Sequence, residues 1–336
     1  MQPRRWPRMF LTKNDHQPIA NEASQAAKQR HLRNAVLGLC VMTAFATIAG
    51  FSNPTFTTVD NLFVVIRAAS MTGIVAIAMS FLTISGNLFA LSASSLGALI
   101  AVVFAVTTSS FGFPIGLALT FGVAVLCGLA QGITVAGFGN PIIATLAFGT
   151  VFRGFAAYLS GNSIVRIDSP AALWLGTARP FGVPTQSWIF MLCALVCWAI
   201  IRHTKLGRQT ILCGSNPHAA RASGLNLAFV TSSAFVFMSV GTAIMAILNV
   251  AQFSQAKADL FWGYDFDYIA AVLVGGIALS GGKGSPMQAA LGAILIALLQ
   301  NYMLLNGFSS GLRMTIVGAL VVAAISVFHI MQGKVR

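Results

Sequence analysis

The sequence predicts an all-α, polytopic membrane protein of about ten transmembrane helices with a weak internal repeat. Three observations predict this class: 57% of the 336 residues are apolar, only 8% are charged, and the apolar residues gather in long runs. Soluble domains are about 45–50% apolar and about 25% charged, so this chain has too few charges to cover a soluble surface of its size. A membrane span needs about 20 apolar residues, and the length accommodates roughly ten spans with short loops.

Apolar runs between polar or Pro/Gly breaks predict the individual spans. In chain order they are 34–52, 62–84, 90–109, 115–136, 141–160, 187–202, 229–251, 267–280, 286–305 and 312–330. The eighth run is short for a full crossing, so we expect it to tilt little or to end inside the protein, where other helices cover its backbone. The transmembrane domain is thus expected to cover residues 34–330.

The net charge of +13 is distributed unevenly, with seven of the 20 basic residues before residue 34. Residues 1–33 read as a basic cytoplasmic tail, because the apolar stretch comes too late for a secretory signal. With the tail inside, the inner segments hold 14 Lys and Arg and the outer loops hold four. This bias predicts that both termini are cytoplasmic, 331–336 included. The same bias explains the net positive charge, so we do not expect the protein to bind nucleic acid.

Candidates for chemistry are few in this sequence. The five histidines lie in the tail, the inner loop or near the inner end of the last span, and none is spaced with a nucleophile or with metal ligands. Residues 281–285 resemble a phosphate loop, but Gly284 separates Lys283 from Ser285 and so breaks the required spacing. We therefore expect no catalytic residue, no metal and no cofactor in this chain. If the protein uses ATP, a partner hydrolyses it.

A weak internal repeat relates two parts of the chain. Residues 74–98 align without gaps on 269–293, and both copies contain an apolar run, a Ser-Gly break and a second apolar run. Biased composition is the alternative explanation, and a channel can also contain repeats. In transporters, interrupted helices of repeats often lie near the substrate path. The candidate path residues at the two breaks are Asn87, Phe89, Ser92, Ser280 and Gly281.

The inner loop, 202–228, is too short for a domain and too polar for a span. Asn216 followed by Pro217 predicts the start of a short helix, because Asn caps free amide groups and Pro suits the first helical position. Gly224 predicts its end. A short, capped surface helix suits docking into a groove on another protein. An ordinary connecting loop is the alternative.

At this loop the sequence resembles the cytoplasmic coupling segment of permease subunits in ribose-type ABC sugar importers. The matching residues are Thr204, Gly207, Arg208, Gly214, Asn216, Ala219, Ala220, Ser223 and Gly224. The stretch 263–285 closely resembles that family's signature, which usually has Arg where Lys283 stands. Residues 141–161 are similar to its fifth span and 56–95 follow its second and third, so the resemblance covers roughly 35–330.

The resemblance implies a permease subunit of an ATP-driven, binding-protein-dependent importer for a sugar or similar small polar solute, in the inner membrane of a bacterium. It implies three partners: an ATP-binding cassette ATPase that uses ATP and Mg, an extracytoplasmic substrate-binding protein, and a second permease subunit, identical or not. The implied ATPase-coupling residues are Gly214, Asn216, Ala219, Ala220, Ser223 and Gly224. Related importers take nucleosides, branched-chain amino acids or signalling furanoses, and these solutes stay open as alternatives.

One stretch departs from the family pattern. The family usually has Gly-Gly-Ile-Asp-Leu-Ser-Val-Gly-Ser after the second span, whereas this chain has Ala90 in place of the Asp, Ser94 in place of a Gly, and one inserted residue. An acidic group at that depth is costly and functional as a rule. Its loss leaves the substrate open and is compatible with a heterodimer whose other half retains the Asp.

Charged residues within or beside the spans are rare. Arg153 lies about 12 residues into a span, or about 18 Å along it, and an unpaired Arg there costs at least about 2.5 kcal/mol. We expect it to pair with a carboxylate or with backbone carbonyls; contact with the substrate is the alternative. Arg67 can reach the headgroups. Asp265 and Asp267 are expected to form an exposed acidic pair on the outer side, which could dock a binding protein or cap a helix start. We favour capping of the eighth helix for Asp267 and leave the role of Asp265 open.

Two other function classes remain to be weighed against the importer. A self-sufficient secondary carrier needs a proton or ion site within the membrane, whereas the only charged residues clearly inside the predicted spans are Arg67 and Arg153. A membrane scaffold or anchor is a third, non-transport alternative, and the docking helix alone is compatible with it.

Overall fold

A computed structural model of the chain describes residues 43, 47, 49–50 and 53–333, with the side chains of 138 and 327–333 left aside. The predicted tail, 1–33, lies outside the described residues, and so does most of the first predicted span. All the helices and strands named below belong to one compact unit of the chain, residues 46–336.

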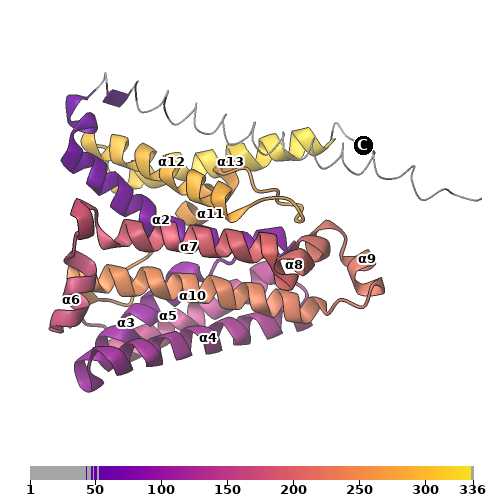
Figure 1. Ribbon diagram of the computed structural model, residues 1–336, viewed down its shortest axis with the longest axis horizontal. Coiled ribbons are helices and arrows are strands. Elements are labelled where there is room, and N and C mark those ends of the chain that lie inside the picture. Colours follow the sequence, from indigo (N-terminus) through magenta and orange to yellow (C-terminus); the bar gives the residue numbers. More distant parts are fainter. Residues whose placement is uncertain (1–42, 44–46, 48, 51–52, 334–336) are drawn as a thin grey trace, which may run out of the picture. The chain divides into compact units, whose positions relative to one another are not determined.

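Helices make up nearly all of the regular structure (Figure 1). The long helices are α2 (Val59–Ile84), α3 (Ala93–Phe111), α4 (Phe113–Phe138), α5 (Pro141–Ser160), α7 (Thr185–His203), α10 (Leu227–Phe253), α12 (Pro286–Leu305) and α13 (Ser310–Gly333). The short helices are η1 (Pro54–Thr57), α6 (Pro170–Thr177), η2 (Pro180–Gly182), α8 (Lys205–Ser215), α9 (Pro217–Ala222) and α11 (Tyr264–Val274). Two short strands are described, β1 (Val165–Arg166) and β2 (Gln255–Ala256).

The predicted class, an all-α polytopic membrane protein, is confirmed. Each of the second to tenth predicted spans corresponds to one helix, and seven helices among the described residues are long and apolar enough to cross a membrane. Two of these nine helices are not among the seven: the apolar part of α13 that is described, Ser310–Ser326, is shorter than 18 residues, and α11 has only 11 residues. At 1.5 Å per residue such a helix is about 16 Å long, roughly half of the hydrocarbon core.

Local sequence signals explain where the spans begin and end. At the start of α5, the Asn140 side chain accepts hydrogen bonds from the amides of Ile142 and Ile143, and Pro141 occupies the first helical position. The helix ends at Gly161, which has a positive φ of 57°. Asn226 caps α10 in the same way, accepting from the Phe229 amide at 3.1 Å. Thr58 and Ser285 cap α2 and α12 likewise, whereas α3, α4 and α7 begin without a side-chain cap.

The core lies along α2, α3 and α10. Within their most apolar windows, 72% of α10 is buried, compared with 22% for α4 and for α7. The outer helices expose large apolar side chains such as Leu126, Ile133 and Leu192. In a soluble protein such a surface marks an interaction site, and here it suits the acyl chains of a bilayer or another subunit.

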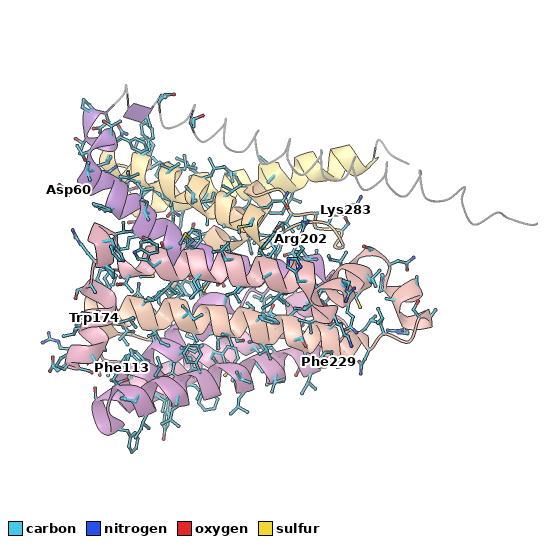
Figure 2. The ribbon with its side chains drawn as sticks, in the orientation of Figure 1. Asp60, Phe113, Trp174, Arg202, Phe229 and Lys283 are labelled. Atoms are coloured by element: carbon cyan, nitrogen blue, oxygen red, sulfur yellow. The ribbon has the colours of Figure 1, made fainter. Side chains whose placement is uncertain are left out.

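The short helices and strands that flank α7 lie at its two opposite ends (Figure 1). At one end, which we name the β end, β1 pairs antiparallel with β2 and α6 precedes α7. At the other, the α8 end, α8 and α9 connect α7 to α10. Figure 2 shows Asp60 and Trp174 at the β end, and Arg202 and Lys283 towards the α8 end.

Two buried asparagines join α2 to α12 at the β end. The amide of Asn61 donates to Asn301 Oδ1, and the amide of Asn301 donates to Asn61 Oδ1, both at 2.9 Å. We expect Asn301→Leu to destabilise the protein by about 1–3 kcal/mol, because it leaves the buried Asn61 Oδ1 without its donor, while the Asn61 amide keeps the Phe56 carbonyl as acceptor at 3.0 Å. Thermal unfolding in detergent measures this loss. The double variant Asn61→Leu with Asn301→Leu should recover most of it, and equal stability of the wild type and the single variant would contradict the assignment.

Candidate functional site

The segment between α7 and α10 folds into two consecutive helices. Thr204 caps α8 by accepting the Gly207 amide at 3.1 Å, and Asn216 caps α9 by accepting the Ala219 amide at 3.0 Å. The cap predicted at Asn216 is confirmed, as is the turn at Gly224, which has a φ of 78°. Helix α8 was not predicted. Its signal was the polar cap at Thr204, but Gly207 and a high share of polar residues concealed it.

Consecutive alanines of α9 lie on different sides of the helix. Ala219 is exposed, whereas Ala220 is only 5% exposed and packs against Cys213 of α8 and Val230 of α10. We expected both side chains to face a partner. The structure corrects this for Ala220, which holds α9 to its own chain. The exposed face of α9 instead includes His218, Ala219, Arg221, Ala222 and Ser223.

The two Ser-Gly breaks of the repeat meet each other at the end of α8. The Gly282 amide donates to the carbonyl of Ile84, the last residue of α2, at 2.8 Å. A Cβ added to Gly281 would lie 2.9 Å from Gly86 Cα and 2.8 Å from the Gly214 carbonyl. A Cβ added to Gly214 would overlap the Ile84 carbonyl. Only glycines allow this approach, so α8 is in direct backbone contact with both breaks.

The five predicted path residues do not line one common cavity. Asn87 and Ser280 line a cavity of about 220 Å³ between the first break, α8 and α9, and the Asn87 amide donates to Thr231 at 3.2 Å. Ser92 is fully buried and donates to Gln131 of α4 at 2.6 Å. Phe89 is partly buried against the core, and Gly281 lies in the glycine contact. Their place in a substrate path stays a prediction.

A larger cavity of about 460 Å³ lies between α3, α5, the start of α11 and α13. Its walls combine apolar residues and Trp262 with polar groups. The sequence did not predict this cavity, because its lining residues come from segments that are far apart in the chain. The polar side chains that line it are Ser94, Ser95, Thr150, Arg153 and Asp265.

Asp265 joins α11 to α3 at this cavity. One carboxylate oxygen accepts the Ser94 backbone amide at 2.9 Å and the other accepts the Ser94 hydroxyl. It thus serves the first turn of α3, whose own N-cap residue Ser92 makes no capping bond. Asp265 was predicted to be exposed, and the structure corrects this, because the side chain is half-buried between two helices.

Asp267 also differs from its predicted role. It accepts a hydrogen bond from the Gln300 amide of α12 at 2.7 Å and is half-buried, whereas the N-cap of α11 is Gly263 without a side-chain bond. Both aspartates lie in the first turn of α11. Because α11 is not among the seven helices long enough to cross a membrane, the expectation that no carboxylate lies well inside the spans stays a prediction.

Arg153 lies over the Trp262 ring, with its guanidinium carbon 3.9 Å from the ring centroid. We expected Arg153 to pair with a carboxylate or with backbone carbonyls; among the described residues the one ion pair within 4 Å joins Lys257 to Asp259, so the pairing with a carboxylate is not found. A cation–π contact explains how the charge is accommodated, and such contacts gain strength when they are desolvated. Arg153 and Asp265 line the same cavity, so a bound solute would meet a positive and a negative group there.

Comparison with known proteins decides the family. The family model described as branched-chain amino acid transport system / permease component matches residues 61–325. This chain belongs to that permease family. It is a transport component rather than an enzyme, and a multi-pass protein of the inner membrane. The resemblance found in the sequence is confirmed.

Several curated relatives match almost the whole chain. The ribose import permease RbsC of Escherichia coli K12 is 30% identical and covers 88% of this chain and 92% of the relative. The probable ABC transporter permease YphD of the same strain is 32% identical over 92% of this chain and 94% of its own length. The autoinducer 2 import permease LsrD of Photorhabdus laumondii is 30% identical over 82% of this chain and 85% of its own length. No solved structure is matched.

Proposed function

We propose that this permease is the membrane-spanning subunit of an ATP-driven, binding-protein-dependent importer for a sugar or similar small polar solute. The observation that carries the proposal is the α8–α9 segment, which offers an exposed helix face at one end of the molecule and is in backbone contact with both repeat breaks. A partner ATPase that uses ATP and Mg docks there. The relatives named for ribose and autoinducer 2 import support a sugar-like solute.

The α8 end is the cytoplasmic end in this proposal. Its basic side chains have no acidic neighbours at that end among the described residues, whereas Asp60, Asp168 and Asp259 offset the basic residues of the β end. Positive loops remain inside. The substrate-binding protein then docks at the β end, and both termini are cytoplasmic.

Cysteine labelling tests this orientation. In a background without the native cysteines, Ser163→Cys in the loop after α5 should react with a membrane-impermeant maleimide in intact cells. His218→Cys on α9 should react only after permeabilisation, because it lies on the cytoplasmic side. Both positions are exposed, so equal reaction after permeabilisation is the control. Labelling of His218→Cys in intact cells would reverse the orientation.

Coupling follows from the glycine contact. When ATP closes the ATPase pair, the docked α9 moves, and α8 transmits the displacement at Gly214 to the loops after α2 and α11. Because these loops precede α3 and α12, both repeat units shift together. The cavity that contains Arg153 and Asp265 then changes its access from one side of the membrane to the other.

A second permease subunit completes the path in this proposal. Helix α5 exposes large apolar side chains such as Leu146 and Phe155, and Trp262 at the mouth of the 460 Å³ cavity is 66% exposed. A second subunit packed on this face would close the cavity from lipid. Whether it is a copy of this chain is tested by co-purification of two differently tagged copies.

Reconstitution tests the function directly. The permease, its ATPase and its binding protein are placed in liposomes, and uptake of labelled ribose, xylose, glucose and galactose is followed with and without ATP. We expect uptake of at least one sugar only when all three components and ATP are present. Uptake by the permease alone, driven by a proton gradient, would instead establish the secondary carrier.

A further inference from the structure

The exposed face of α7 changes from apolar to cationic along its length. Its exposed large apolar side chains are Trp188, Met191, Leu192, Leu195 and Val196. They recur at intervals of three and four residues and so form one stripe along the helix. Arg202 is exposed and follows Leu195 by seven residues, which is about two turns further along the same stripe. An apolar stripe that ends in a cation is typical of a helix that passes from the hydrocarbon to the headgroups.

The start of α8 brings two further cations beside Arg202. Lys205 and Arg208 are both exposed and lie one turn apart on α8. A Cβ added to Gly207, between them, would overlap the carbonyl oxygens of Ile200 and Ile201. The first turn of α8 is therefore pressed against the last turn of α7. We name the three exposed cations of these two turns the α7–α8 basic cluster: Arg202, Lys205 and Arg208.

Within the part of the chain that the structure describes, this cluster has no acidic partner. The sequence contains no acidic residue between Asp168 and Asp259, and the one ion pair within 4 Å joins Lys257 to Asp259. Like charges in neighbouring turns repel one another, so a bound anion would stabilise the cluster. A phosphate group suits it, because the guanidinium of an Arg donates two parallel hydrogen bonds to phosphate oxygens.

An aromatic side chain lies against the cluster. The guanidinium carbon of Arg202 is 5.7 Å from the centroid of the Trp198 ring, and the His203 ring meets the same ring edge to face, also at 5.7 Å. Trp is enriched at the boundary between hydrocarbon and water, at the level of the lipid headgroups. This depth, together with the apolar stripe that leads to it, favours a lipid over an acidic surface of a protein as the source of the anion.

We propose that the α7–α8 basic cluster binds the phosphate of one anionic phospholipid, whose acyl chains lie along the apolar stripe of α7. Arg202 and Arg208 donate to the phosphate oxygens, and Lys205 adds its charge. A zwitterionic lipid binds less tightly, because the same cations repel its ammonium group. Only the assignment of this leaflet as the cytoplasmic one rests on the proposed function. Because α8 begins at the cluster, the lipid holds the start of the α8–α9 segment at the membrane surface.

Native mass spectrometry of the delipidated, full-length permease in a non-ionic detergent tests the site. Phosphatidylglycerol is the anionic probe, phosphatidylcholine is the zwitterionic one, and inorganic phosphate is added in competition. We expect saturable retention of one phosphatidylglycerol, binding of phosphatidylcholine that is weaker by about tenfold or more, and no displacement by phosphate.

Two double variants identify where the lipid binds. Arg202→Gln with Arg208→Gln should weaken the binding of phosphatidylglycerol about 30-fold, as expected for the loss of two cations at a membrane surface. Arg166→Gln with Arg179→Gln removes two exposed cations near the β end instead and should leave the affinity within about twofold. Thermal unfolding verifies that both double variants remain folded, which is expected because all four side chains are exposed.

Several outcomes would overturn this site. They are equal affinity for the two lipids, equal weakening by the two double variants, or displacement of the lipid by inorganic phosphate, which would establish a site for the free anion. Unchanged lipid binding in the cluster variant together with lost ATPase co-purification would assign the cluster to a protein contact. Lipid binding is measured without solute or partners, so uptake that is independent of ATP would refute the importer and leave this site standing.

Discussion

Ala219→Glu is expected to abolish co-purification of the partner ATPase while the permease remains folded. Ala219 is exposed on α9 and touches no core cluster, so the substitution leaves the packing of the chain intact. In the docked complex, the glutamate would overfill a groove shaped for alanine and bury an unpaired charge. Such a charge costs several kcal/mol at an interface, which lowers the affinity by a factor of hundreds or more. Uptake should fall with it.

Ala220→Glu is the matched variant one residue further along. Ala220 is buried against Cys213 and Val230, so the glutamate would place a charge inside the permease itself. We expect a lower unfolding temperature and loss of α9 packing, with ATPase binding lost as a consequence.

Two measurements separate these variants. Co-purification reports ATPase binding, and thermal unfolding of the permease alone reports folding. Ala219→Ser, which adds one small polar atom, serves as the control and should behave as the wild type in both. Wild-type ATPase binding and uptake by Ala219→Glu would remove α9 from the interface and favour the secondary carrier.

Gly214→Val is expected to reduce solute uptake while ATPase binding remains. An added side chain at Gly214 would overlap the Ile84 carbonyl and lie within 2.5 Å of the Gly282 amide, so α8 must move away from both breaks. Overpacking of this kind costs about 1–3 kcal/mol. We expect uptake to fall at least about tenfold, a loss of about 1.4 kcal/mol in coupling, while the exposed face of α9 still binds the ATPase.

The control for this position is Gly137→Val, near the C-terminal end of α4. Gly137 is helical, and an added Cβ there meets nothing within 4 Å, so the same change in side chain should leave uptake within about twofold. Uptake at wild-type level in Gly214→Val would show that the glycine contact does not transmit motion. Loss of ATPase binding in that variant would show that the contact serves docking instead.

The spans could be predicted because a bilayer demands a long, continuous apolar run with polar ends. The caps at Asn140 and Asn216 were equally readable, since capping is decided by neighbours in sequence. Helix α8 was missed because it lies outside the bilayer, where an apolar run is not required and Gly207 lowers its helix propensity.

Long-range contacts were beyond the sequence. Asp265 and Ser94 are 171 positions apart, so no local pattern could place the carboxylate at the start of α3. The burial of Ala220 depends on how α8 and α10 cross, and Ala219 beside it has the same residue type and the opposite environment. The repeat did predict two equivalent breaks, but their contact through Gly86, Gly214 and Gly281 required the fold.

Site-specific photocrosslinking tests most directly whether α9 is the ATPase-docking element. A photoreactive benzophenone amino acid is placed at Ala219 and, separately, at Ser163 in the loop after α5, and intact cells expressing the complete system are irradiated. We expect Ala219 to crosslink to the ATPase and Ser163 to crosslink to no ATPase. An ATPase crosslink from Ser163 together with none from Ala219 would contradict the assignment of the α8 end as the cytoplasmic coupling surface.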